Sequence, residues 1–236
     1  MTKRNITIIS VVVLAIAVLI IGLLIKQKSG AADYKDYYSA NDTKETKIVK
    51  LWIGTRKMQD ALGEKSLYPE YYRQVKTMEI NGAKKEEILK KTEQDIIERY
   101  ALYHNAKNKG FYASDKEVRR HVDFVISEMK KSDDYGKIQA IYEKEGTTFE
   151  KEYRANIRWN RFDATIKKWE KYFIKKASKN GAAASIEKKR RGIVAAYKKT
   201  DEYEALDKTL KECKKVLNRY GGNYEEIKKN GEALAP

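Results

Sequence analysis

The pattern of apolar and polar positions divides the chain into two unequal parts. An unbroken apolar run covers residues Ile6 to Ile25, whereas almost everything after Lys26 is strongly polar. A helix of about 20 apolar residues is long enough to span the ~30 Å hydrocarbon layer of a bilayer. We therefore expect a transmembrane segment within residues 1–28, a polar tether over residues 29–47 and a large polar part after it.

The flanks of the apolar run indicate an uncleaved signal-anchor. The run is longer than the roughly 7–15 residues of a cleavable signal core, and Lys26 and Lys28 separate it from the small residues 30–32 that offer a cleavage site. Basic residues on the two sides nearly balance, so the positive-inside rule does not settle the orientation. The very short basic tail is typical of a signal. We expect a single-pass cell-membrane protein with its large part outside the cytoplasm.

The polar part has helical spacing of its apolar residues, and no stretch alternates as a half-buried strand does. Asn180-Gly181 interrupts this pattern. We predict an all-α fold, in which a helical domain covers residues 48–180 and further helices cover residues 181–236.

Helix boundaries can be placed by local signals. Ser114 and Glu117 have the spacing of a capping box, and Gly110 is suited to end the preceding helix. Thr147 and Glu150 have the same capping-box spacing, and they predict the start of a long helix that reaches about residue 178.

Two apolar patterns on these helices have more than one interpretation. The long helix carries two apolar stripes, so it either packs on two sides or leaves one side for a partner. The last strong helix has a regular seam, typical of helix pairing. The first stripe of the long helix is Tyr153 and Ile157, the second is Trp159, Phe162, Ile166, Trp169 and Phe173, and the seam is Tyr203, Leu206, Leu210, Cys213 and Leu217.

The charge is strongly basic, with a formal net charge of +16. Most of the excess is spread over the polar part, as on a solvated surface, and the clusters that stand out are Lys188–Arg191 and Lys214-Lys215. A basic surface attracts anionic lipids, anionic envelope polymers or acidic polypeptides. We do not expect nucleic acid as a partner of an outward-facing domain.

Catalytic and metal-binding patterns are not found in the sequence. His104 and His121 fall on different predicted helices, and the lone Cys213 belongs to an apolar seam, so these residues do not suggest a metal site or a nucleophile. A glycine-rich phosphate loop is also missing. We expect a protein that is not an enzyme and that needs no cofactor or metal.

Three segments of the middle region resemble a known family. They are the turn at Met78–Gly82, the helix end and capping box at Ala106–Val118, and the step into the long helix at Glu145–Arg154. Their order and spacing are similar to those of the N-terminal chaperone domain of SurA- and PrsA-type extracytoplasmic foldases. The resemblance covers roughly residues 78–175, under half of the chain.

The resemblance implies a SurA-like helical domain that binds unfolded or partly folded secreted polypeptides. Relatives of this type carry parvulin prolyl-isomerase domains after the long helix. Here helices follow at once after residues 180–185, and the strands that a parvulin domain needs are missing, so isomerase activity is not implied. The alternative is a structural or scaffold protein that uses a chaperone-like fold to hold a partner in an envelope assembly, which the regular seam favours.

The aromatic residues are the remaining candidates for client binding. Chaperone surfaces that accept many sequences use broad aromatic and apolar patches. The alternative is that the same side chains form the core of the helical domain. The candidates are Tyr100, Tyr103, Phe124, Trp159, Phe162, Trp169 and Phe173.

Overall fold

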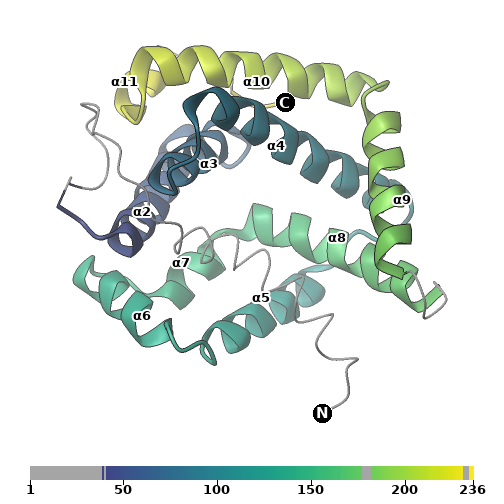
Figure 1. Ribbon diagram of the computed structural model, residues 1–236, viewed down its shortest axis with the longest axis horizontal. Coiled ribbons are helices and arrows are strands. Elements are labelled where there is room, and N and C mark those ends of the chain that lie inside the picture. Colours follow the sequence, from purple (N-terminus) through teal and green to yellow (C-terminus); the bar gives the residue numbers. More distant parts are fainter. Residues whose placement is uncertain (1–38, 40, 177–181, 231–233) are drawn as a thin grey trace.

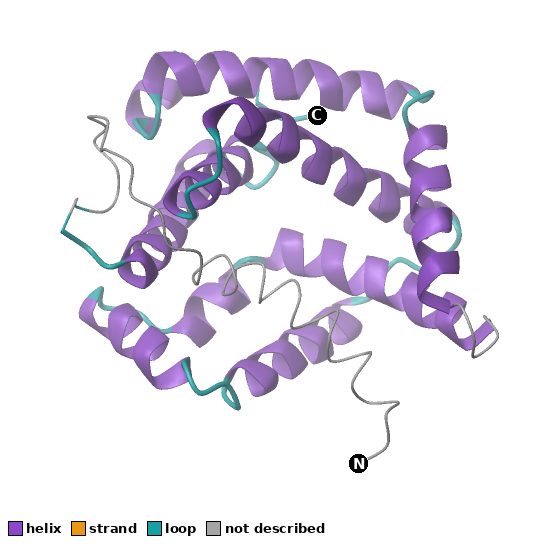
Figure 2. Cartoon of the chain, viewed as in Figure 1, coloured by secondary structure: helices purple, strands orange, loops and turns teal. Residues whose placement is uncertain are grey.

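The computed structural model describes residues 39, 41–176, 182–230 and 234–236, and its regular structure within these ranges is entirely helical (Figure 2). The all-α prediction is confirmed for this part of the chain. The helices, labelled as in Figure 1, are α2 (Lys44–Leu62), α3 (Tyr68–Ile80), α4 (Lys85–Asn108), α5 (Asp115–Met129), α6 (Tyr135–Lys144), α7 (Phe149–Ala155), α8 (Ile157–Lys176), α9 (Ala182–Tyr197), α10 (Asp201–Tyr220) and α11 (Tyr224–Lys229).

The predicted transmembrane run at residues 6–25 lies outside the described residues. Among the helices that are described, none is long and apolar enough to cross a membrane. The predicted tether at residues 29–47 overlaps α2, which already begins at Lys44.

Local signals placed several helix ends correctly. The Ser114 hydroxyl accepts the backbone N–H of Glu117, whose carboxylate in turn accepts the backbone N–H of Ser114 at 2.9 Å, so the predicted capping box is formed. α4 ends at Asn108, and Gly110 just beyond it has a φ of 79°. A positive φ of this size is a conformation that glycine adopts without steric cost.

The predicted long helix is wrong, because the chain forms two helices that meet at Asn156. This residue has φ −85° and ψ 52°, outside the helical region. The side chain of Asn160 donates to the carbonyl of Tyr153 at 2.7 Å, and so satisfies an acceptor that a continuous helix would bond internally. Asparagine side chains compete with the backbone in this way and favour helix ends.

The second predicted capping box is also wrong, by one position. The N-cap of α7 is Thr148, which accepts the backbone N–H of Lys151 at 3.1 Å. Thr147 instead donates its hydroxyl to Glu152 at 2.7 Å. Either threonine can cap a helix, so the spacing to Glu150 alone did not identify which one does.

The main core surrounds α4, which packs against α3, α8, α9 and α10. Buried residues from α2, α3, α4, α8, α9, α10 and α11 belong to this one cluster. In Figure 1, α9 runs from the end of α8 to the start of α10, so it closes one side of the assembly. Two smaller clusters lie between α5 and α8 and between α2 and α6.

The C-terminal helices are part of the main core. Leu206, Leu210 and Cys213 of the predicted seam are at most 2% exposed and pack in this cluster. The hydroxyl of Tyr68 donates to the carbonyl of Gly221 at 2.6 Å, which joins the start of α3 to the turn after α10. Both predicted segments, 48–180 and 181–236, thus contribute to one core.

Candidate functional site

Four of the seven candidate aromatic residues are buried in the main core. Tyr100, Trp159, Phe162 and Trp169 are 4%, 3%, 7% and 0% exposed. Phe162 stacks face to face on Tyr103 of α4 with 3.7 Å between ring centroids, and it meets the ring of Tyr100 in an edge-on arrangement with 5.2 Å between centroids. The aromatic stripe of α8 therefore packs against α4, and a partner could reach these four rings only if the core opened.

The other three candidates occupy different surroundings. Tyr103 and Phe173 are half-buried and pack on the edge of the main core. Phe124 is 44% exposed on α5 and is not part of this cluster. The structure thus brings six of the seven predicted residues together in one packed layer and leaves Phe124 apart. A client-binding role for these residues stays a prediction.

A buried charged cluster lies between α2, α3, α4 and α8. Glu70 of α3 is 4% exposed, and its carboxylate accepts hydrogen bonds from Arg73, from Gln74 at 2.9 Å and from Arg99 at 3.2 Å. Arg99 also donates to Asp163 of α8 at 2.8 Å. Two carboxylates and two guanidinium groups balance here, so the cluster carries no excess charge for a ligand.

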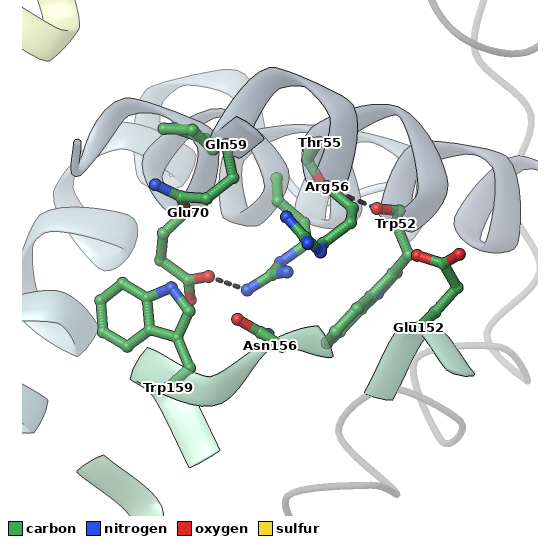
Figure 3. A pocket seen from close by; sticks show the side chains of 10 residues that line it. Trp52, Thr55, Arg56, Gln59, Glu70, Glu152, Asn156 and Trp159 are labelled. Atoms are coloured by element: carbon green, nitrogen blue, oxygen red, sulfur yellow. Dashed lines mark hydrogen bonds and ion pairs between the residues drawn. The ribbon is translucent and has the colours of Figure 1, made fainter. Parts of the chain in front are cut away.

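The cavity at this cluster is small. Figure 3 shows Trp52 and Trp159 on opposite sides of it, with Glu70 on the same side of the view as Trp159. The guanidinium of Arg73 lies 4.0 Å from the ring centroid of Trp52, and that of Arg99 lies 4.5 Å from that of Trp159. The free space is about 20 Å³, which is room for about one water molecule. This cluster is suited to holding four helices together and has no room for a substrate.

A larger hollow lies between the C-terminal half of α4 and α9, and we call it the α4–α9 groove. Its volume is about 680 Å³, and it is half-open to solvent. The residues that line it divide into an apolar floor and a polar rim. The floor is Ala101, Ile193, Ala196 and Tyr197, and the rim is His104, Asn105, Asn108, Lys109, Lys188, Lys189, Gly192, Thr200 and Glu202.

The electrostatics of the α4–α9 groove are basic. Neither Lys109 nor Lys188 forms an ion pair with any residue that the structure describes, and the ammonium of Lys189 lies 5.6 Å from the ring centroid of Phe173. Burial lowers the pKa of His104, which favours the neutral form of this imidazole. Three lysines thus face a single carboxylate, that of Glu202.

Gly192 is an unusual residue in the wall of this groove. It lies inside α9, where glycine costs about 1 kcal/mol relative to alanine. A Cβ atom built there would meet nothing within 4 Å, so no neighbour within the described chain requires a glycine. The wall of the groove is therefore open on the side where a Cβ of residue 192 would lie.

The sequence contained only weak signals for this groove. The predicted cluster Lys188–Arg191 supplies two of its lysines, and Gly192 follows directly in a helical pattern. Among the described residues, no group of three or more His, Cys, Asp or Glu side chains is placed to hold a metal ion. Cys213 is fully buried, and this burial raises the pKa of its thiol, which disfavours a thiolate nucleophile.

Comparison with known proteins adds no relative. No family model matches the chain, and no curated protein and no solved structure matches it. Nothing in these comparisons identifies a SurA- or PrsA-type foldase, so the resemblance in residues 78–175 stays a prediction. The α4–α9 groove is accordingly judged by its own geometry.

Proposed function

We propose that this chain is a membrane-tethered, extracytoplasmic helical protein that binds unfolded or partly folded polypeptides in the α4–α9 groove, without isomerising prolyl bonds. The single observation that carries the proposal is the groove itself. It is much larger than the cavity at the buried charged cluster, and it combines an apolar floor with polar groups along its rim. A polypeptide needs both, because it presents apolar side chains and backbone hydrogen-bonding groups together.

The dimensions of the groove suit an extended chain. Along α9 its lining residues run from Lys188 to Tyr197, which is about 13–14 Å at 1.5 Å per residue. An extended polypeptide advances about 3.3–3.6 Å per residue, so about four client residues fit. A small-molecule pocket encloses most of its ligand, whereas this groove is half-open.

The cellular setting in this proposal comes from the sequence. The apolar run at residues 6–25 supports a tether in the membrane, and the resemblance in residues 78–175 supports a client-binding role. The scaffold alternative was favoured by the seam from Tyr203 to Leu217. Since this seam packs inside the chain's own core, it does not need an external partner to explain it.

The decisive experiment fills the groove at Gly192. The full chain is reconstituted into lipid nanodiscs and titrated against a fluorescently labelled, permanently unfolded protein such as reduced and carboxymethylated α-lactalbumin. Gly192→Trp should weaken binding by about tenfold or more, as expected for loss of a binding hot spot. Gly192→Ala is the matched control for folding, since its Cβ has free space in the unbound chain, and it should weaken binding less than Gly192→Trp does.

Two results would contradict the proposal. The first is that wild-type nanodiscs bind the unfolded protein no better than empty nanodiscs do. The second is that Gly192→Trp, with a far-UV circular dichroism spectrum like that of the wild type, binds with unchanged affinity.

A further inference from the structure

Among the described residues, the four basic residues Lys188–Arg191 in the middle of α9 divide into two that form ion pairs and two that do not. Arg191 pairs with Glu187 of the same helix at 3.7 Å. Arg190 donates to Glu98 of α4 at 3.1 Å and to Glu170 of α8 at 2.5 Å, so its charge is balanced by two carboxylates. Lys188 and Lys189 line the groove instead, and neither forms an ion pair with a residue in the described ranges. Positive charge is therefore left over on the groove side of α9.

The position of Gly192 narrows the class of ligand that would contact the α9 side of the groove. It follows Lys188 by one helical turn, and both residues line the groove. The empty space beside Gly192 leaves room for the backbone of a bound chain next to these lysines. A ligand that uses both features must present a main chain and a carboxylate together, which a polypeptide with acidic side chains does.

We propose that the α4–α9 groove selects acidic segments of its polypeptide clients, with client carboxylates at Lys188 and Lys189 and the client backbone passing over Gly192. This inference rests on the proposed function and adds to it the chemistry of the preferred client. Charge complementarity is the reason, because three lysines on the rim face one carboxylate.

A polynucleotide is disfavoured by the aromatic residue of the groove. Single-stranded nucleic acids gain affinity by stacking their bases on exposed aromatic rings. Tyr197 is only 6% exposed, and its ring already lies 5.4 Å from that of His104. Glu202 at the far end of the groove would also repel a continuous run of phosphates.

The test compares three labelled peptides of about twelve residues. Each has glycine and serine flanks around a centre in which leucine alternates with glutamate, with glutamine or with lysine. Their anisotropy is measured against nanodiscs that carry the full chain as wild type, as Lys188→Gln with Lys189→Gln, or as Lys214→Gln with Lys215→Gln. The last variant is the matched control, because it removes the same charge from α10, away from the groove.

We expect the wild type to bind the glutamate peptide about tenfold or more tightly than the glutamine peptide, with weaker binding at high salt. The Lys188/Lys189 variant should lose this preference, and the Lys214/Lys215 variant should keep it. A charge-reversed variant, Lys188→Glu with Lys189→Glu, should prefer the lysine peptide. Circular dichroism of each variant checks that the helices are retained.

Three results would overturn the inference. One is equal wild-type affinity for the glutamate and glutamine peptides, and another is an equal loss of preference in the two lysine variants. The third is tight binding of an oligothymidylate that displaces the glutamate peptide. If the glutamate preference is missing while Gly192→Trp still blocks the unfolded protein, the inference fails and the proposed function stands. If no client binds at all, both fail.

Discussion

Replacement of Glu70 by glutamine should show how much the buried charged cluster contributes to the stability of the fold. The carboxylate of Glu70 is 4% exposed and accepts hydrogen bonds from Arg73, Gln74 and Arg99. Glutamine has nearly the same volume, so the change leaves no cavity. It removes the negative charge and brings amide hydrogens against groups that are themselves donors.

The loss of unfolding free energy depends on which carboxylate partners Arg73 and Arg99 keep after the substitution. Arg99 keeps Asp163 as a partner at 2.8 Å, and both of these side chains are partly exposed. The lost contact between Arg99 and Glu70 therefore lowers the stability only a little. Arg73 is 12% exposed, and Glu70 is its carboxylate partner within the described chain. Removing one partner of a buried pair costs about 3–5 kcal/mol. Because Arg73 alone loses its carboxylate partner, we expect the free energy of unfolding to fall by about 3 kcal/mol. This is a large share of the ~5–15 kcal/mol by which folded proteins are stable.

The measurement is urea denaturation of the full chain in mild detergent, followed by far-UV circular dichroism. Asp60→Asn is the control, because Asp60 pairs with Arg56 in the same part of the fold but is 62% exposed, and it should cost at most about 1 kcal/mol. Replacing Glu70 and Arg73 together with leucine should recover part of the loss, since no unpaired charge then stays buried. A loss of less than about 1 kcal/mol for Glu70→Gln would refute the reasoning.

Three further predictions concern other parts of the fold. Trp169→Ala should lower the unfolding free energy by about 3–5 kcal/mol. Phe124→Ala, on an exposed part of α5, should lower it by less than about 1 kcal/mol. Equal losses in urea denaturation would contradict the burial of Trp169 and the exposure of Phe124. Gly110→Val should lower the unfolding free energy by about 1–3 kcal/mol. The cause is the positive φ alone, because no atom lies within 4 Å of an added Cβ. An unchanged melting temperature would disprove this. The hydrogen bond from Lys168 lowers the pKa of Glu117 from 4.5 to about 2, so this carboxylate stabilises the fold above pH 4.5 and loses that effect as the pH falls toward 2. Glu117→Gln should therefore be less stable than the wild type above pH 4.5, with the difference shrinking below it in urea denaturation, and a difference that does not change with pH would contradict the assignment.

Helix positions that depend on neighbours along the chain could be predicted from the sequence. The capping box at Ser114 and the helix end before Gly110 each involve residues within one turn of each other, and both are confirmed. The break at Asn156 could not be predicted in the same way. Its neighbours have helical spacing, and the break becomes visible only when Asn160 is seen to bond the carbonyl of Tyr153.

The candidate site was harder to predict, because burial depends on what lies opposite a side chain. The sequence placed Trp159 and Phe162 on one stripe, but it could not show that Tyr100 and Tyr103 of α4 cover that stripe. Both interpretations of the stripe were therefore open before the structure was known. Pairs of aromatic residues at helical spacing have the same pattern in a core as on a binding surface.

The α4–α9 groove depends on contacts between segments that are far apart in sequence, and the same contacts would pre-organise it for the client that we propose. Arg190 and Glu98 are 92 positions apart, and their hydrogen bond ties α9 to α4, while Glu170 ties the same arginine to α8. Toward the other end, the ring of Tyr197 packs against His104. Because α9 is held near both ends of the groove, its lysines and Gly192 would already be in position for the client that we propose. Binding would then not require the groove to be ordered first, so more of the contact energy would remain available as affinity.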